Sequence, residues 1–305
     1  MEYNQIFDAL HSKYYTGEGF SGVTSSHWKN YGAQATVTRR NQQFDITTYG
    51  ISKCFERKSI SCSIKHLPID FLLYRFLKEH NARKKTITCA KSITSQLNVY
   101  FHFDHAKHIL SFDLIDSYDL FHNGFVCIIG DGHGFFGTLI KKMLPETNII
   151  FINLGRNLLI DAICFSRIFP GVEPLYLQKQ EDLEFIDSSS VVFLEAEHCE
   201  FMKKLPVGLF INIASMQEMD MFMVKKYFEY MRTSTEEPYF YCCNREEKTL
   251  PDGSVIRFDD FPWGGDVLVD GRCPWYQLYP TRRPPFWRPF EGALMHRLIK
   301  LDTTK

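Results

Sequence analysis

The sequence predicts a doubly wound α/β protein built on a mostly parallel sheet. Five short segments are apolar on both faces, as buried parallel strands are. Segments with the apolar spacing of helices lie between them, and a glycine-rich turn joins the first of these strands to the first helix. Strands and helices that alternate through short connections indicate right-handed crossovers in one sheet.

The region before the sheet is mixed and polar. Ile69–Leu77 has the apolar spacing of a helix, while Ser95–His102 fits either a strand or the end of a helix. Residues 1–120 are therefore expected to form an N-terminal mixed cap that binds an acceptor, over a domain of residues 121–305 that holds the main ligand.

Within residues 121–245 the predicted strands and helices follow one another closely. Pro145 ends the first helix and Pro170-Gly171 ends the second. The strands are expected at Phe125–Ile129, Asn148–Leu154, Val191–Ala196, Leu209–Ala214 and Tyr239–Cys243, and the helices at Phe135–Met143, Leu158–Phe169 and Met219–Met231. Residues 246–305 are rich in loops, with Val255–Phe258 and Arg297–Leu301 as two late strands.

Composition excludes some classes of partner. The chain has 305 residues, with 35 Lys and Arg against 36 Asp and Glu, so its net charge is −1. That balance gives no bulk electrostatic attraction to nucleic acid or to an anionic membrane, so neither is expected as a partner. The nine cysteines include no Cys-x-x-Cys pair, and no apolar run approaches the ~18 residues of a membrane span. A cytoplasmic protein without structural zinc is expected.

The strongest chemical signal is the segment Gly130-Asp131-Gly132-His133-Gly134-Phe135-Phe136-Gly137. It follows a predicted strand and opens a helix, where glycines let the backbone approach a ligand. Gly132-x-Gly134-x-x-Gly137 fits the dinucleotide fingerprint. Asp131 within the glycines also fits the acidic pattern of S-adenosylmethionine sites, and its charge suits a cationic ligand and repels a pyrophosphate. A tight turn without a ligand is the plainer alternative.

A resemblance to a known family rests on two segments. The sequence VCIIGDGHGFFGTLIKKMLPETNIIFINLG, followed by FINIASMQEMD, resembles the class I S-adenosylmethionine-dependent methyltransferases, and more narrowly the bacterial sugar O-methyltransferase family, over roughly residues 120–245. The resemblance implies a Rossmann-like, seven-stranded sheet with an antiparallel last strand. It also implies methyl transfer from S-adenosylmethionine to a hydroxyl of a sugar, a sugar nucleotide or another small molecule.

The same resemblance implies which residues hold the donor. The glycine loop lines its methionine side, residues after the second strand meet its ribose, Glu195 lies near its adenine, and residues after the fourth strand lie beside its methyl group. The implied residues are Gly130, Asp131, Gly132, Gly134, Phe135, Asn153, Leu154, Glu195, Asn212, Ser215, Met216 and Gln217. Asn153 stands where the family has an acidic residue, and an amide can still bond to a hydroxyl.

Two residues are candidate general bases for the acceptor hydroxyl. His198 has the intrinsic pKa of a base at neutral pH, and Glu218 follows the fourth strand near the expected methyl group. Either side chain has a purely structural alternative role.

Other functions remain open at this point. An NADP-dependent oxidoreductase is favoured by Gly137 and by Arg156, which could receive a 2′-phosphate, but the sequence has no evident Tyr-x-x-x-Lys pair after the fourth strand. A nucleic-acid or protein methyltransferase is disfavoured by the net charge and by the absence of an Asn-Pro-Pro-Tyr-like motif. A protein that binds the donor without catalysis is a further alternative.

Several clusters have weaker interpretations. His102, His105 and His108 lack the further ligands of a metal site, so no metal is expected. An aromatic and arginine-rich segment is either an acceptor wall or a surface wrap, and four N-terminal rings are expected to face the pocket. The first set is Trp263, Trp275, Tyr276, Tyr279, Arg282, Arg283, Trp287 and Arg288, and the second is Tyr14, Tyr15, Trp28 and Tyr31. A homodimer is also expected.

Overall fold

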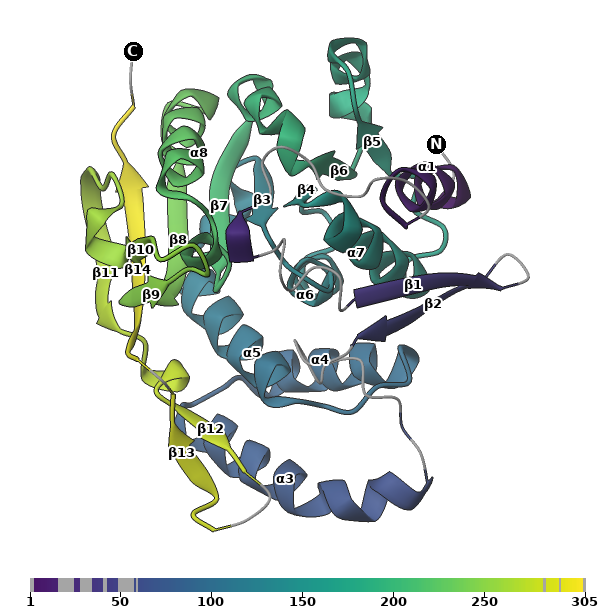
Figure 1. Ribbon diagram of the computed structural model, residues 1–305, viewed down its shortest axis with the longest axis vertical. Helices are drawn as coiled ribbons and strands as arrows, with labels where there is room; N and C mark the ends of the chain where they lie inside the picture. Colours follow the sequence, from purple (N-terminus) through teal and green to yellow (C-terminus); the bar gives the residue numbers. More distant parts are fainter. Residues whose placement is uncertain are drawn as a thin grey trace.

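A mixed sheet of eight strands organises the residues that the structure describes (Figure 1). The computed structural model describes residues 3–15, 25–27, 35–40, 43–48, 58, 60–281, 284–290 and 292–303. The strands of this sheet are β3 (Phe125–Ile129), β4 (Ile149–Asn153), β5 (Leu175–Leu177), β6 (Val191–Glu195), β7 (Val207–Ile213), β8 (Tyr239–Arg245), β11 (Gly265–Arg272) and β14 (Leu294–Leu301). Their order across the sheet is β11-β14-β8-β7-β3-β4-β6-β5.

The strand directions match the predicted fold class. Each neighbouring pair from β5 to β8 is parallel, and β14 runs antiparallel to both β8 and β11. Ile128 on the central strand β3 lies opposite Phe151 on β4 and Ile211 on β7. The doubly wound, Rossmann-like α/β sheet is thereby confirmed, as are the five predicted parallel strands.

Two details of the sheet differ from the prediction. The three-residue strand β5 adds an unpredicted edge beside β6, so the sheet has eight strands and not seven. The expected late strand at Val255–Phe258 is present as β10 (Val255–Arg257), but it pairs with β9 (Glu247–Thr249) in a separate hairpin and is not part of the main sheet. β11 is the second late strand of the main sheet. It was not predicted because its sequence is mostly exposed and polar and forms no apolar run.

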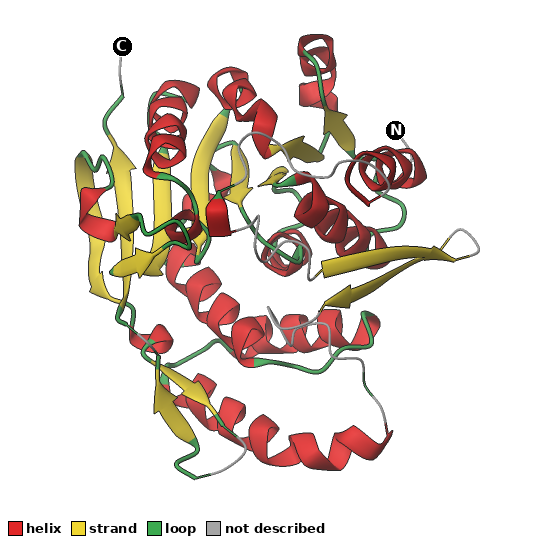
Figure 2. Cartoon of the chain, in the orientation of Figure 1, coloured by secondary structure: helices red, strands yellow, loops and turns green. Residues whose placement is uncertain are grey.

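Side chains alternate between two helical layers. On β3, Val126 and Ile128 face one core, whereas Cys127 and Ile129 face the other. The first core is covered by α1 (Tyr3–Tyr15), α3 (Ile60–Glu79), α4 (Lys84–Gln96), α5 (Phe103–Asp116), α6 (Phe135–Met143) and α7 (Gly155–Ile168). The second core is covered by α8 (Met221–Ser234) and the 3₁₀ segment η5 (Ala196–Lys204) (Figure 2).

The helix boundaries follow the sequence signals closely. α6 spans the residues predicted for it and ends just before Pro145, and α7 ends just before Pro170. The ambiguous segment Ser95–His102 turns out to contain the end of α4, followed by Asn98 in the left-handed conformation with φ of 57°. A helix end, and not a strand, therefore occupies this place.

The N-terminal helix packs on the sheet domain through a glycine. The Tyr14 ring of α1 lies so close to Gly155, the first residue of α7, that a Cβ there would stand 1.9 Å from a ring carbon. β1 (Ala35–Arg40) and β2 (Gln43–Thr48) form a separate hairpin near α7 (Figure 1). Residues from before position 120 thus share the first core with residues that follow it.

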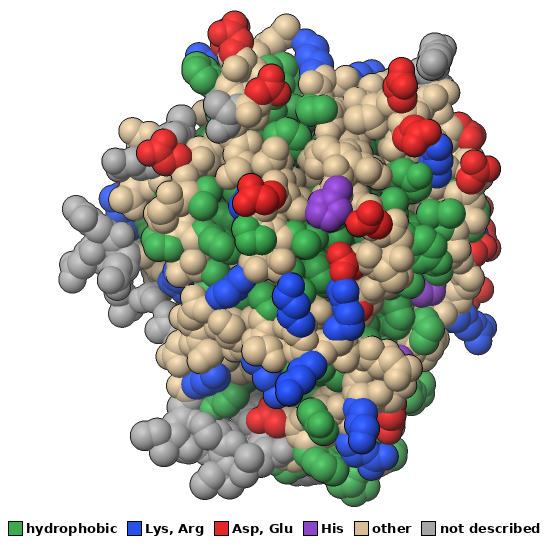
Figure 3. All heavy atoms as spheres, turned by 180° about the vertical axis from the view of Figure 1, so that it is seen from behind, with side chains coloured by type: hydrophobic (Ala, Val, Ile, Leu, Met, Phe, Trp, Pro, Cys, Tyr) green, Lys and Arg blue, Asp and Glu red, His purple; other side chains and the backbone are tan. Residues whose placement is uncertain are grey.

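The surface agrees with the near-zero net charge. The reverse face of the molecule carries side chains of both signs (Figure 3). Among the described helices, none combines the length and apolar character needed to cross a bilayer.

Candidate functional site

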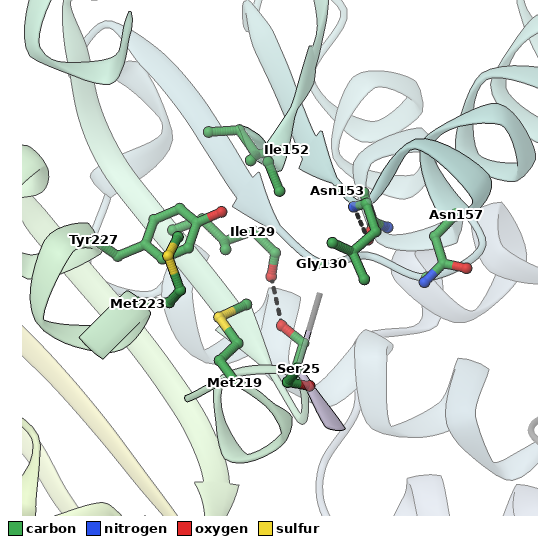
Figure 4. Close-up of a pocket in the computed structure, with 13 residues that line it drawn as sticks. Ser25, Ile129, Gly130, Ile152, Asn153, Asn157, Met219, Met223 and Tyr227 are labelled. Atoms are coloured by element: carbon green, nitrogen blue, oxygen red, sulfur yellow. Dashed lines mark hydrogen bonds between the residues drawn. The ribbon is translucent and has the colours of Figure 1, made fainter. Parts of the chain in front are cut away.

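A cavity of about 550 Å³, including space open to solvent, lies at the carboxyl ends of the central parallel strands (Figure 4). This is the edge of an open α/β sheet where ligands bind. Its lining residues are Ser25, Ile129, Gly130, Gly132, Ile152, Asn153, Leu154, Asn157, Ala196, Ser215, Met219, Met223 and Tyr227. Five of the predicted donor residues are among them: Gly130, Gly132, Asn153, Leu154 and Ser215.

The turn between β3 and α6 depends on its glycines. Gly130 and Gly132 have φ angles of 77° and 80°, in the left-handed region that disfavours side chains. A Cβ on Gly130 would stand 2.3 Å from Ser215 Oγ, so this glycine lets the turn approach the end of β7. A Cβ on Gly132 would meet nothing within 4 Å, so this residue leaves one edge of the cavity open.

Asp131 is turned away from the cavity lining and into the start of α6. Its carboxylate accepts the backbone N–H of Phe136 at 3.2 Å and of Gly137 at 2.8 Å. Burial acts to raise the pKa of Asp131, but His133, whose Nδ1 lies 3.6 Å from Oδ1, helps to hold that pKa below its usual value. The carboxylate is therefore ionised and occupies the helix N-terminus. Gly134 and Phe135 also lie outside the lining.

Two amides form the polar side of the cavity. Asn153 donates from Nδ2 to Asp161 Oδ2 at 2.8 Å, and its own Oδ1 accepts the N–H of Leu154 at 2.9 Å. Burial raises the pKa of Asp161 well above its usual value, and nearby Asp131 adds to this shift. Asn157 lines the cavity as well. Asn157 was not predicted from the sequence; it lies in the first turn of α7, shortly after Asn153 ends β4.

The residues at the end of β7 and just after it mostly support the wall from behind. Asn212 donates to the carbonyl of Ile129 at 2.8 Å and accepts the N–H of Met216 at 3.0 Å. Ser215 Oγ donates to the same carbonyl at 3.0 Å and lines the cavity. Met216 is fully buried in the second core, and Gln217 accepts the N–H of Arg245 at 2.7 Å. These bonds fix β7 against β3 beneath the cavity.

Glu195, at the end of β6, is held by the N-terminal helix. It accepts hydrogen bonds from the hydroxyls of Tyr14 and Tyr176, and Lys13 Nζ lies 3.1 Å away. It lies outside the cavity lining, whereas the next residue, Ala196, is part of it. His198 is also outside, one-third exposed, with Nε2 3.7 Å from Glu197.

Glu195, Glu197 and His198 bring ligand atoms within 4.8 Å of one another, as a metal site would. The Lys13 ammonium contacts both carboxylates and supplies the positive charge there. His105 instead stacks on His133 with ring centroids 6.1 Å apart, and His108 meets the same ring edge to face at 5.8 Å. Neither group is assigned a metal.

Glu218 lies beside the cavity with two basic partners. Its Oε1 accepts from Lys248 Nζ at 2.7 Å and lies 3.4 Å from His27 Nε2. Its backbone carbonyl accepts a hydrogen bond from Ser25, which lines the cavity. Ser25 and His27 were missed in the sequence, because nothing local connects them to residues almost 200 positions later.

The described side chains of the predicted aromatic wall pack away from the cavity. Trp287 stacks on Phe76 of α3 with centroids 5.3 Å apart, and Trp263 stacks over Phe240 at 6.2 Å. None of the described members of that set lines the cavity. Tyr14 and Tyr15 likewise contact Glu195 and the Arg156 carbonyl. Trp28, Tyr31, Arg282 and Arg283 lie outside the described residues.

Comparisons with known proteins give a likeness in fold. No protein-family model matches the chain, and no curated protein matches it. Similar solved structures include an S-adenosylmethionine-dependent methyltransferase from Anabaena variabilis, at 10% identity over 63% of this chain and 83% of that one, with a TM-score of 0.42. Magnesium protoporphyrin IX methyltransferase from Synechocystis matches at 8% identity over 64% and 81%, with a TM-score of 0.35. The glycopeptide N-methyltransferase MtfA matches at 10% over 62% and 89%, with a TM-score of 0.35.

Likenesses this distant carry no conclusion about activity. The narrower resemblance to sugar O-methyltransferases stays a prediction, since no family model matches. What the cavity binds must follow from its own chemistry.

Proposed function

We propose that this protein is an S-adenosylmethionine-dependent O-methyltransferase whose acceptor is a hydroxyl of a sugar or another small molecule. The observation that carries the proposal is the cavity beside the glycine turn at the carboxyl ends of β3 and β4, with the ionised Asp131 buried within that turn and directed to the start of α6. A carboxylate in this position favours a ligand that carries an ammonium and a sulfonium group.

The same observation disfavours the dinucleotide alternative. A pyrophosphate needs the free N–H groups of a helix N-terminus, and two of those in α6 already donate to Asp131. Gly137, which completes the dinucleotide fingerprint, has a packing role, because a Cβ there would stand 2.3 Å from the Phe151 ring. Arg156 lies over the Tyr15 ring, 5.0 Å from its centroid, and is not part of the cavity lining.

The remaining walls suit an adenosine. Apolar side chains from β4, η5, α8 and the connections beside them surround the cavity, and an adenine ring needs such surfaces. These side chains are Ile152, Leu154, Ala196, Met219, Met223 and Tyr227. Asn157 would bond to ribose hydroxyls through its amide, and Asn153, whose amide already bonds to Asp161 and Leu154, would add its second Nδ2–H. Gly130, Gly132 and Ser215 would border the methionine part.

In methyl transfer the main task of this chain is to align the acceptor oxygen with the donor methyl group. The donor methyl group is already activated, so holding the acceptor oxygen in line supplies much of the rate. Residues 1–120 contribute Ser25 to the wall, which supports their proposed role as an acceptor-binding cap. The sugar acceptor, and a homodimer, rest on the sequence resemblance.

The test is calorimetric titration of the whole protein with S-adenosylhomocysteine and separately with NADPH. We expect micromolar binding of the first, weakened about tenfold or more, or at least ~1.4 kcal/mol, in Asp131→Asn. Asparagine removes the charge and keeps one oxygen, so one of the two bonds from the α6 N–H groups should remain. Binding of NADPH alone would overturn the proposal.

A further inference from the structure

A carboxyl group lies buried behind the polar side of the cavity. Asp161, on α7, has an exposed fraction of 0%. Its neighbours in the helix, Ile160 and Ala162, belong to the apolar first core. Burying a polar group among apolar side chains costs free energy unless hydrogen bonds replace those lost to water. The contacts of the Asp161 side chain therefore bear on why an acid is found at this position.

Asp161 holds the side chain of Asn153, which lines the cavity at the end of β4 (Figure 4). Asn153 Nδ2 donates to Asp161 Oδ2 at 2.8 Å, and Asn153 Oδ1 accepts the backbone N–H of Leu154 at 2.9 Å. A backbone N–H can bond only to the oxygen of an amide, so the Leu154 contact fixes which end of the side chain is nitrogen. The second N–H of Nδ2 remains for a ligand of the cavity.

Asp161 also lies against the glycine turn. A Cβ on Gly134 would stand 2.7 Å from the Asp161 carbonyl oxygen and 2.9 Å from its Cα, so the turn packs directly on this part of α7. Asn157, one helical turn before Asp161, lines the cavity as well. Asp161 therefore lies where the glycine turn, the end of β4 and the first turns of α7 come together.

The surroundings of Asp161 favour its protonated form. Burial raises the pKa of Asp161 well above its usual value, and the nearby Asp131 carboxylate raises it further. The hydrogen bond from Asn153, the charge of His133 and the backbone N–H of Gly134 oppose this shift. A protonated carboxyl group still accepts a hydrogen bond at its carbonyl oxygen. Oδ2 can therefore hold Asn153 without placing a second negative charge beside Asp131.

Resting on the proposed binding of S-adenosylmethionine, we propose that Asp161 is a positioning residue for recognition of the donor ribose. Its carboxyl group keeps the Asn153 amide in one orientation, and the second Nδ2–H of Asn153 donates to a ribose hydroxyl oxygen. The ligand thus meets a neutral donor group, while the acid stays behind the wall. An amide that is already held in place loses little rotamer freedom when the ligand binds, so this arrangement favours affinity.

Calorimetric titration of the full protein with three probes tests this role. The probes are S-adenosylhomocysteine and its two analogues that lack the 2′-hydroxyl or the 3′-hydroxyl of the ribose. Asp161→Leu keeps the branched shape of the side chain and removes the acceptor for Asn153. We expect it to weaken binding of S-adenosylhomocysteine about tenfold. For one of the deoxy analogues the loss should be about threefold or less, because the hydroxyl that Asn153 contacts is absent there.

Two further variants separate positioning from folding. Asp161→Asn keeps an oxygen that accepts from Asn153 and resembles the protonated acid, so it should bind all three probes within about threefold of wild type. Thr138→Val is the matched control, because Thr138 is buried on α6 and its hydroxyl donates to the carbonyl of Gly134 at 2.5 Å, at the same glycine turn. Any loss of affinity in this control should be equal for the three probes. Urea unfolding verifies that each variant is folded.

The outcomes separate this role from the proposed function. An equal loss for all three probes in Asp161→Leu would show that the residue is merely structural and overturns the proposal. A loss in Asp161→Asn as large as in Asp161→Leu overturns it as well. Where Asp161→Leu does not fold, the smaller Asp161→Ala replaces it with the same expected pattern. A wild-type protein that binds none of the three probes overturns the proposed function, and this role of Asp161 with it.

Discussion

Gly132 and Gly253 share a backbone conformation but not a location. Their φ angles are 80° and 86°, and a Cβ on either would meet nothing within 4 Å. Only Gly132 lines the cavity. The pair therefore separates the cost of a side chain in the left-handed region from the cost of blocking the site.

We expect Gly132→Leu to weaken S-adenosylhomocysteine binding at least about tenfold, or ~1.4 kcal/mol, because the new side chain extends from the open edge of the cavity. Gly253→Leu should bind as wild type. Both should lose about 1–2 kcal/mol of unfolding free energy from backbone strain. Calorimetry and urea unfolding measure the two effects, and equal binding by both variants would contradict the placement of the site.

His108 should make the protein sensitive to acid. Burial, helped by His133, lowers its pKa to about 4 against the opposing charges of Asp131 and Asp104. Below the unfolded value of about 6.5, the unfolded chain binds a proton that the folded protein does not. Stability is therefore lost as the pH falls from 6.5 towards 4, with a slope approaching ~1.4 kcal/mol per pH unit for this group.

His108→Gln should flatten that dependence in urea unfolding followed between pH 7.5 and 4.5. His105 is buried with its pKa lowered well below the usual value, so part of the slope should remain. The exposed His122 provides the control, since His122→Gln should leave the slope unchanged. An unchanged slope in His108→Gln would assign the acid sensitivity to other groups.

The sequence anticipated site residues unevenly, for physical reasons. Gly130 and Gly132 were found because a strand, a glycine turn and a helix are contiguous in the chain. The orientation of Asp131 could not be predicted, because the sequence does not show that its carboxylate accepts hydrogen bonds from the N–H groups of α6. Ser25 and His27 were missed because only the folded chain brings them to Glu218.

At the scale of elements, two tyrosines on α1 have opposite surroundings. The Tyr14 hydroxyl donates to the buried Glu195, whereas the buried Tyr3 hydroxyl finds no hydrogen-bond partner among the described residues. Each can be replaced by phenylalanine with its ring contacts kept. The two variants therefore measure what holds α1 to the sheet.

Tyr14→Phe should lose about 1–3 kcal/mol of unfolding free energy, because Glu195 stays buried with one donor fewer. Tyr3→Phe should be neutral or stabilising, since it removes an unpaired buried hydroxyl. Urea unfolding at pH 7 compares them. A loss in Tyr3→Phe as large as in Tyr14→Phe would show that the hydrogen bond to Glu195 does not anchor the helix.

Helices could be predicted where the apolar spacing of the sequence and a helix-ending proline indicated the same boundary. α6 and α7 have apolar spacing and a proline just past each end, so their positions were read closely. β5 and β11 lacked such signals. β5 has only three residues, and β11 is an exposed edge strand whose pairing with β14 comes from backbone hydrogen bonds that any sequence can make.

At the scale of the whole molecule, a ligand of the cavity should stabilise both helical layers together. Ile129 and Met223 of its lining belong to the second core, and Leu158 of the first core lies on α7 beside Asn157. S-adenosylhomocysteine at about 100 times its Kd should therefore add ~2.7 kcal/mol to the unfolding free energy. Thermal unfolding with and without ligand measures this. NADPH at the same concentration should add nothing, and a gain with NADPH alone would contradict the proposed donor.

The position of β14 has a consequence for biosynthesis. β14 follows β11 in the chain but lies between β11 and β8 in the sheet, pairing with both. While the ribosome is still making residues 265–272, their place at the sheet edge does not yet exist. The parallel strands can associate during translation, but β11 must wait for a later segment to be inserted beside β8. Until that insertion the edge of β8 is open, and chaperones that shield unpaired strands would have their clearest target there.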